Sequence, residues 1–232
     1  MTDRAAAWSA LATVRDPELD EPITDLGFVA ELTIEPAVDG PGVRARLRLP
    51  TYFCAPNFAY LMVADAYDAL AGLPGVASVD VRLEDHFAAE EINAGVAAGA
   101  GFGGSFPGQA TGELAELRRT FHRKAHAACL ERACRRLLAE GWQIESLADA
   151  RLADVPESPE RAGLLRRRAD LGLPDGPDAP LVIDDGGAPV PPGQVAPRLR
   201  FARTVRVSIE GNSGWCRGLL RTRYETTEEG AT

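Results

Sequence analysis

The 232-residue sequence predicts an α+β fold: a small α-β-β-α-β domain with helices packed on one sheet, followed by a mixed α/β C-terminal extension. Two stretches, residues 28–35 and 43–49, alternate apolar and polar side chains, as half-buried strands do. Between residues 56 and 73, apolar side chains recur instead at helical spacing. A third alternating stretch follows at residues 76–83, and one sheet with helices on a face suits this order of elements.

Turn residues set the boundaries of these elements. An opening helix over residues 3–14 ends at Asp16-Pro17, because the residue before a proline avoids the helical region. A Gly/Pro cluster at residues 38–42 joins the first two strands, which predicts an antiparallel hairpin. Pro74-Gly75 then separates the second helix from the third strand.

The second half of the chain predicts a further unit of helices and strands. A long helix starts at Thr111, which caps it, and a second helix covers residues 159–171. Residues 201–209 alternate as a strand, residues 181–183 form a shorter one, and residues 189–197 form a proline-rich loop. The expected organisation is a domain at 1–95, a glycine-rich connector at 96–110 and the extension at 111–232.

The glycine-rich stretch at residues 95–108 predicts a flexible connector or lid. A phosphate-binding loop is the weaker interpretation, because no Gly-Lys-Ser/Thr follows and no strand leads directly into the glycines. Phe102 and Phe106 would fold such a loop over a pocket near Cys54.

Charge and hydropathy exclude several classes of protein. The net charge is −9, and residues 1–110 carry 6 Lys and Arg against 16 Asp and Glu, which makes a poor surface for nucleic acid. No apolar run reaches the length of a membrane span, and the first residues lack the apolar core of a signal peptide. The four cysteines show no dense disulfide spacing. We therefore expect a cytoplasmic protein without nucleic-acid or membrane partners, and the sequence leaves a homo-oligomer open.

Cys54 lies at the turn between the second predicted strand and the helix that follows it. Unpaired N–H groups and the positive end of the helix dipole favour a thiolate at such a turn, which predicts a pKa below about 8.5. A thiolate can attack an electrophile or bind a soft metal. A small buried apolar residue is the alternative interpretation of a free cysteine.

The residues around this turn resemble a known family. Residues 16–29 read DPELDEPITDLGFV, Thr51 and Cys54 follow Pro50, and LPGV at residues 73–76 precedes the third strand. In this order, these motifs resemble the SufT/PaaD-type iron–sulfur cluster assembly family over about residues 5–95. The resemblance implies a compact α/β domain in which Cys54 is the residue most closely tied to cluster or metal transfer. It also implies that the pocket of Cys54 includes Thr51, Asp16, Glu18 and Asp25.

The same resemblance implies a cofactor and partners. It points to an iron–sulfur cluster or iron, held transiently, and to a client metalloenzyme or cluster scaffold proteins as partners. A bacterial oxygenase is the client suggested by analogy. Read from the residues alone, Asp16 and Asp25 are better explained as turn residues, with Gly27 at positive φ, than as catalytic carboxylates.

A second candidate site lies on the predicted helix that starts at Thr111. His122, His126 and Cys129 are spaced so that they share one narrow stripe, which is suitable for zinc or iron. The alternative is a charged helix whose histidines are simply hydrated. Cys134 lies outside the stripe, and Cys216, expected just after a strand, would complete a three-thiol site if it met Cys129 and Cys134.

Three functional hypotheses follow from these residues. The favoured one is a non-enzymatic factor that assembles or matures an iron–sulfur or metal centre in a client, with Cys54 as its thiolate. The second is an enzyme that uses Cys54 as nucleophile with His86 or His122 as base. The third is an interaction scaffold in which all four cysteines are structural.

Overall fold

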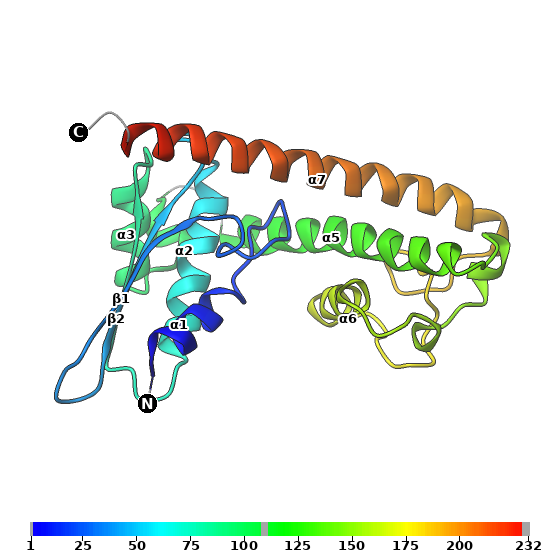
Figure 1. Ribbon diagram of the computed structural model, residues 1–232, viewed down its shortest axis with the longest axis horizontal. Helices are drawn as coiled ribbons and strands as arrows, with labels where there is room; N and C mark the ends of the chain where they lie inside the picture. Colours follow the sequence, from blue (N-terminus) through cyan, green and yellow to red (C-terminus); the bar gives the residue numbers. More distant parts are fainter. Residues whose placement is uncertain (1, 108–110, 229–232) are drawn as a thin grey trace. The chain divides into compact units, whose positions relative to one another are not determined.

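The computed structural model describes residues 2–107 and 111–228. The chain forms two compact units (Figure 1): unit 1 comprises residues Met1–Ala115 and Gly211–Thr232, and unit 2 comprises Glu116–Glu210. Within the described residues, no helix combines the length and the apolar character needed to cross a membrane.

Unit 1 contains the predicted α-β-β-α-β order. Its elements are α1 (Arg4–Leu11), β1 (Val29–Glu35), β2 (Gly42–Arg48), α2 (Pro56–Ala71) and β3 (Ser78–Glu84). The sheet order is β1-β2-β3, in which β1 and β2 pair antiparallel and β2 and β3 pair parallel. The predicted antiparallel hairpin is therefore confirmed.

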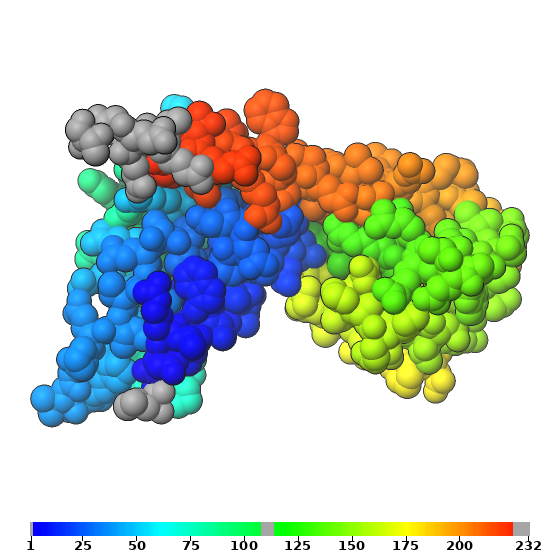
Figure 2. Space-filling view, in the orientation of Figure 1, coloured from blue at the N-terminus to red at the C-terminus, as the bar shows by residue number. Residues whose placement is uncertain are grey.

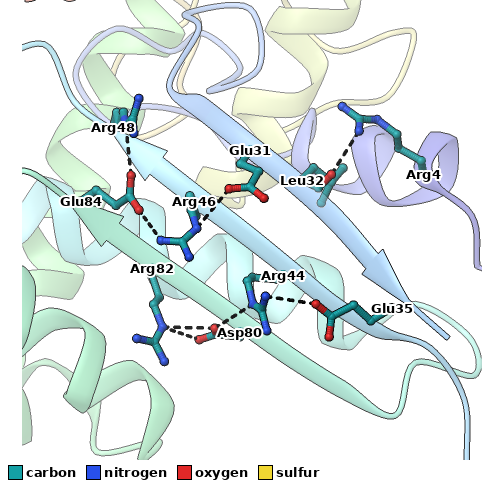
Figure 3. Close-up of polar contacts among 10 residues, drawn as sticks. All are labelled: Arg4, Glu31, Leu32, Glu35, Arg44, Arg46, Arg48, Asp80, Arg82 and Glu84. Carbon is teal, nitrogen blue, oxygen red and sulfur yellow. Dashed lines mark hydrogen bonds and ion pairs between the residues drawn. The ribbon is translucent and has the colours of Figure 1, made fainter. Parts of the chain in front are cut away.

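The alternation of side chains along β2 explains why the sheet has one covered face. Val43, Ala45 and Leu47 are buried in the core of unit 1, whereas the arginines between them lie on the outer face. Figure 3 shows those arginines in a ladder of ion pairs with acidic side chains of the neighbouring strands. The pairs are Arg44–Glu35 at 3.1 Å, Arg44–Asp80 at 3.4 Å, Arg46–Glu31 at 3.2 Å, Arg46–Glu84 and Arg48–Glu84 at 3.0 Å.

The glycine-rich stretch is helical where the sequence predicts a connector or lid. It contains the end of α3 (Ala89–Ala97) and all of α4 (Gly101–Ser105). Phe102 is buried in the core of unit 1, where its ring lies 5.3 Å from that of Tyr60 and 5.0 Å from that of Phe106. Glycine is required at position 95, because a Cβ there would lie 1.7 Å from Oγ of Ser105. The glycines thus allow close helix packing.

Unit 2 is helical, and the predicted strand at residues 201–209 is wrong. That segment lies inside α7 (Pro192–Glu228), while α5 (Thr111–Ala139) and α6 (Pro159–Leu171) begin where the sequence predicts helices. Phe201 and Val207, which produce the apparent alternation, are 58% and 53% exposed. The buried positions recur every three or four residues, which is helical spacing: they are Val195, Leu199, Ala202, Arg206 and Ile209.

The other predicted elements of the extension also differ from the structure. Residues 181–183 form no strand, and Ile183 makes only an isolated bridge to Pro189. The loop expected over residues 189–197 is wrong from Pro192 onward, where α7 begins. Proline is well tolerated in the first turn of a helix. Two short 3₁₀ helices, Glu145–Ala148 and Leu152–Asp154, connect α5 to α6.

Two of the buried arginines of unit 2, Arg168 and Arg206, connect separate segments through polar contacts. The guanidinium of Arg168, which is fully buried, donates to the carbonyl oxygens of Pro174 at 2.7 Å, Pro180 at 3.0 Å and Leu181 at 2.7 Å. Arg206 donates to a carboxylate oxygen of Glu131 at 2.5 Å, and both side chains are about 10% exposed. Both contacts hold helices or loops of unit 2 together.

We expect Arg206→Met to destabilise unit 2 by about 3–5 kcal/mol, because it leaves the Glu131 carboxylate buried without its cation. Urea unfolding of the full chain, followed by circular dichroism, measures this loss. The double variant Arg206→Met/Glu131→Leu should recover most of it, and Arg203→Met, at an exposed position of the same helix, is the control. An equal loss in the single and double variants would contradict the prediction.

Candidate functional site

The parallel pairing of β2 and β3 places three loops at one edge of the sheet. The carboxyl ends of parallel strands meet at the same edge, so the loops after β2 and after β3 lie together. Since β1 runs antiparallel to β2, the loop that leads into β1 lies at that edge too. These loops contain Cys54, His86 and Asp16, respectively.

Cys54 occupies the predicted turn. It lies two residues before α2, whose N-cap is Ala55 and whose first residue is Pro56. Its thiol is partly buried and packs against the core of unit 1, and Thr51 is half-buried in the same turn. The predicted position of Cys54 in the turn before a helix is confirmed.

His86 fixes the backbone of this turn. Its Nε2 lies 2.7 Å from the carbonyl oxygen of Cys54, and its Nδ1 accepts the N–H of Ala88 at 3.2 Å. Because Nδ1 is the acceptor, Nε2 carries the proton and donates it to the carbonyl. Burial lowers the pKa of His86, so the ring is neutral at pH 7. With both nitrogens engaged, His86 is not placed to act as the base of a cysteine nucleophile.

Aromatic rings surround the exposed side of the turn. Phe53 is 79% exposed, and Tyr52 and Phe87 are about half exposed. The N–H of Phe87 donates to the carbonyl oxygen of Tyr52 at 3.2 Å, which ties the two loops together. The ring centroids lie 5.1 to 6.5 Å apart. We call Tyr52, Phe53 and Phe87 the aromatic cluster.

The loop before β1 is organised by Asp16. Its Oδ1 accepts the backbone N–H groups of Glu18 and Leu19, both at 2.8 Å, which is the turn chemistry that the sequence predicts. Gly27 has the expected positive φ of 78°. Asp25 is exposed, and its side chain accepts from the hydroxyl of Thr24 at 3.2 Å. Asp16 is thus a buried organiser of the loop, whereas Asp25 lies at the surface.

The C-terminal part of α7, residues 211–228, lies against these loops within unit 1. In Figure 2 this orange-red segment adjoins the medium-blue part of unit 1. Asn212 donates to a carboxylate oxygen of Glu18 at 3.2 Å, and Leu220 lies over Gly27, where a Cβ would come within 3.3 Å of it. Arg223 donates to the carbonyl oxygen of Leu49 at 3.1 Å.

Arg217 adds two further contacts from α7 to the loop before β1. Its guanidinium donates to the carboxylate of Glu21 and to the carbonyl oxygen of Asp25. Cys216, the neighbouring residue, is half-buried and packs against the core of unit 1, as Cys54 does. The structure therefore places Cys216 inside a helix, beside the Cys54 turn, and not after a strand as the sequence predicts.

Burial and acidic neighbours keep both thiols protonated. Burial raises the pKa of Cys54 to about 12, with further contributions from Asp16 and Cys216. Burial also raises the pKa of Cys216 to about 11, and Asp16 and Glu18 act in the same direction. The predicted low pKa of Cys54 is wrong, because the N–H of Ala55, which favours the thiolate, has less effect than burial and negative charge.

The stripe of His122, His126 and Cys129 does not form a ligand group. Across residues 2–107 and 111–228, no three His, Cys, Asp or Glu side chains are arranged to hold a metal ion. His126 is 2% exposed, and burial lowers its pKa to about 4, whereas His122 is partly exposed. Cys129 and Cys134 are buried in the apolar core of unit 2. Cys216 belongs to unit 1, so the proposed three-thiol site gains no support.

Sequence reasoning missed that Cys216 belongs to unit 1, on the helix segment that contacts the loops around Cys54. The signal was present in the spacing of Asn212, Cys216, Leu220 and Arg223, which share one helical face. Interpreting residues 201–209 as a strand leaves no helix on which Cys216 could share a face with these residues. The aromatic cluster was missed because its members come from two loops that only the parallel strand pairing brings together.

Comparison with known proteins identifies the part of the chain that carries Cys54. Residues 4–81 match the family model described as "Iron-sulfur cluster assembly protein". The chain is similar to that family over these residues, which we call the assembly domain. The loop before β1, the Cys54 turn and most of β3 all lie within the matched residues, whereas α7 lies outside this assembly domain.

Two relatives resemble the assembly domain. An iron–sulfur cluster carrier protein of Mycobacterium leprae is 37% identical over 81 residues, which are 35% of this chain and 20% of that protein. An uncharacterized protein of Methanocaldococcus jannaschii is 29% identical over 93 residues, 40% of this chain and 93% of that protein. The chain thus spans about a fifth of the carrier protein's length. No solved structure gives a significant match.

We expect His86→Ala to destabilise unit 1 by about 1–3 kcal/mol, because it removes the partners of the Cys54 carbonyl and the Ala88 N–H. The turn should also loosen, so that Cys54 reacts faster with a maleimide. Denaturant unfolding and labelling followed by mass spectrometry measure the two effects. Glu90→Ala, at an exposed position on α3, is the control. Unchanged labelling together with unchanged stability would refute the role of His86.

Asp16 should make the stability of unit 1 depend on pH. Burial raises its pKa from 3.8 to about 6, so the folded protein binds this proton more tightly than the unfolded chain does. Above pH 6 the buried charge therefore destabilises the fold, by about 3 kcal/mol, and this penalty disappears as the pH falls toward 4. Asp16→Asn keeps an oxygen for the two N–H groups without the titration.

The measurement compares the unfolding free energy of the parent and of Asp16→Asn between pH 4 and 7. The variant should gain stability relative to the parent as the pH rises through 6. Asp39→Asn, in the exposed hairpin turn, is the matched control. A stability difference between parent and Asp16→Asn that is constant over this range would be inconsistent with the raised pKa.

Proposed function

We propose that this protein is an iron–sulfur cluster assembly or carrier factor that holds a cluster, or its iron, through Cys54 and passes it to a client metalloenzyme. The observation that carries the proposal is the place of Cys54: a half-buried thiol of the family-matched domain, at the edge of the sheet where three loops converge. In this view the cluster is cargo, and the protein is not an enzyme.

The electrostatics of the site support a cation as the cargo. The carboxylates of Asp16 and Glu18 are close enough to oppose the negative charge of a thiolate at Cys54. An iron centre reverses that relation, because it favours the deprotonated thiol and is attracted by the same carboxylates. Each thiol must release a proton when iron binds and regain one when iron leaves. A thiol that is readily reprotonated suits temporary holding.

The surroundings of Cys54 support a protein partner. The aromatic cluster is exposed, and aromatic rings are enriched in protein–protein interfaces. A client that covers these rings would come against the Cys54 turn. We propose a metalloenzyme as this client, and an oxygenase by analogy with accessory proteins of the family. The four free cysteines fit a reducing compartment such as the cytoplasm.

The same geometry disfavours a cysteine-nucleophile enzyme. Such an enzyme needs a thiolate near neutral pH and a base within hydrogen-bond reach. The pKa of Cys54 is raised to about 12, and His86 uses both ring nitrogens to hold the loops. His122 belongs to unit 2. The carrier proposal needs neither a base nor a low pKa.

The test is cluster loading and transfer without oxygen. The parent protein, reconstituted with iron and sulfide, should bind both and pass the cluster to an apo-ferredoxin acceptor, as followed by the acceptor's absorbance. Cys54→Ser should lose this transfer while its melting temperature stays near that of the parent, because one sulfur is replaced by oxygen at a partly exposed turn. Co-expression with a candidate oxygenase extends the test to client maturation.

Cys134→Ser is the matched control, since Cys134 is a buried thiol in the core of unit 2. It should bind and transfer the cluster like the parent. If Cys54→Ser transfers the cluster as well as Cys134→Ser does, the proposed role of Cys54 fails.

A further inference from the structure

We propose that Cys216 is the second ligand of the cargo, so that Cys54 and Cys216 together bind one thiophilic metal centre through their two sulfur atoms. This inference deepens the proposed function and rests on it for its biological meaning. Cys216 lies outside the residues that match the assembly family. The second thiol is therefore a property of this chain, supplied by α7.

Contacts on both sides of Cys216 fix its place. Toward the N-terminus of α7, Asn212 bonds Glu18 in the loop before β1. Toward the C-terminus, Arg223 bonds the carbonyl oxygen of Leu49, at the end of β2. Cys216 falls on the same helical face between these two anchors. The Cys54 turn and the Asp16 loop are the segments that this part of the helix covers.

The arginines of α7 explain why the helix is held there. Arg223 also donates to the carbonyl oxygen of Asp85, at 2.5 Å, and Arg217 binds the Glu21 carboxylate. These guanidinium groups satisfy backbone carbonyls that the ends of β2 and β3 leave open, and charge-assisted hydrogen bonds of this kind are strong. The ring of Tyr224 adds a contact with the guanidinium of Arg48 at 5.0 Å. Cys216 is thus presented by a well-anchored segment.

The two thiols also influence each other. Cys54 and Cys216 both pack against the core of unit 1, and a charge on Cys216 contributes to raising the pKa of Cys54. The charge of Asp16 also contributes to raising the pKa of both thiols. A cation bound to both thiolates would offset these unfavourable charges.

Binding is a proton exchange without any change in oxidation state. A divalent metal ion forms two metal–sulfur bonds, two S–H bonds break, and two protons pass to solvent. Iron in sulfur clusters and zinc in thiolate sites are generally four-coordinate. Two protein thiolates would therefore leave two positions for sulfide or for a ligand of the client. A carrier that supplies half of the ligands can hand the metal over without first releasing it.

The experiment titrates the full-length protein with cobalt(II) under anaerobic, reducing conditions. Thiolate-to-cobalt charge-transfer absorbance reports sulfur ligands directly. The parent should show this absorbance at one cobalt per chain. Cys54→Ser and Cys216→Ser should each lose about half of it or more, since each removes one of two thiolates. The double variant should lose all of it, and Cys134→Ser should match the parent.

A second measurement tests the proximity of the two thiols in the unsubstituted protein. Its result therefore does not depend on whether α7 still packs in place in a variant. Dibromobimane, which links two thiols only when they are near neighbours, is applied to the parent protein, and the cross-linked peptides are read by mass spectrometry. A Cys54–Cys216 link is expected. Full charge-transfer absorbance in Cys216→Ser, or the absence of this link in the parent, would overturn the proposal.

The outcomes separate the site from the function. If the parent binds cobalt through both thiols but transfers no cluster to the acceptor, the two-thiol site stands and the carrier function fails. If the parent transfers clusters and Cys216→Ser does so equally, with its absorbance intact, the carrier function stands and the second ligand is disproved.

Discussion

The parallel pairing of β2 with β3 is the constraint on which the site depends. Parallel neighbours require a crossover, here α2, and they end at the same edge of the sheet. The Cys54 turn follows β2 and the His86 loop follows β3, so the 2.7 Å hydrogen bond between them is a consequence of strand direction. Had β3 paired antiparallel, its C-terminal loop would lie at the opposite edge, away from Cys54.

The sequence predicts unit 1 well because local patterns decide its elements. The alternation in β2 corresponds to a real inner and outer face, and Pro74-Gly75 does separate α2 from β3. The same reasoning failed at residues 201–209, where alternation and helical spacing overlap. There Arg206 occupies a buried position where a solvent-facing residue is expected, and its ion pairs with Glu131, far away in sequence, and with Glu210 make that burial tolerable.

The chemistry of Cys54 shows a second limit of sequence reasoning. Its position before α2 could be predicted, since it depends on neighbouring residues. Its pKa could not, because burial and the approach of Asp16 and Cys216 determine it, and these residues come from other segments. A helix N-terminus favours a thiolate only while water or a cation is at hand. In this fold the surroundings are apolar and acidic instead.

The ion-pair ladder on the outer face of the sheet has a consequence for recognition. Arg44, Arg46 and Arg48 are each matched by carboxylates of the adjoining strands, so opposite charges alternate over a short distance and largely cancel (Figure 3). Such a surface offers a partner protein little apolar area and little net charge. Desolvating its ion pairs on binding would also be costly. The outer face of the sheet is therefore a poor docking surface, and the proposed client contact lies instead at the edge of the sheet, where the aromatic cluster and Cys54 are.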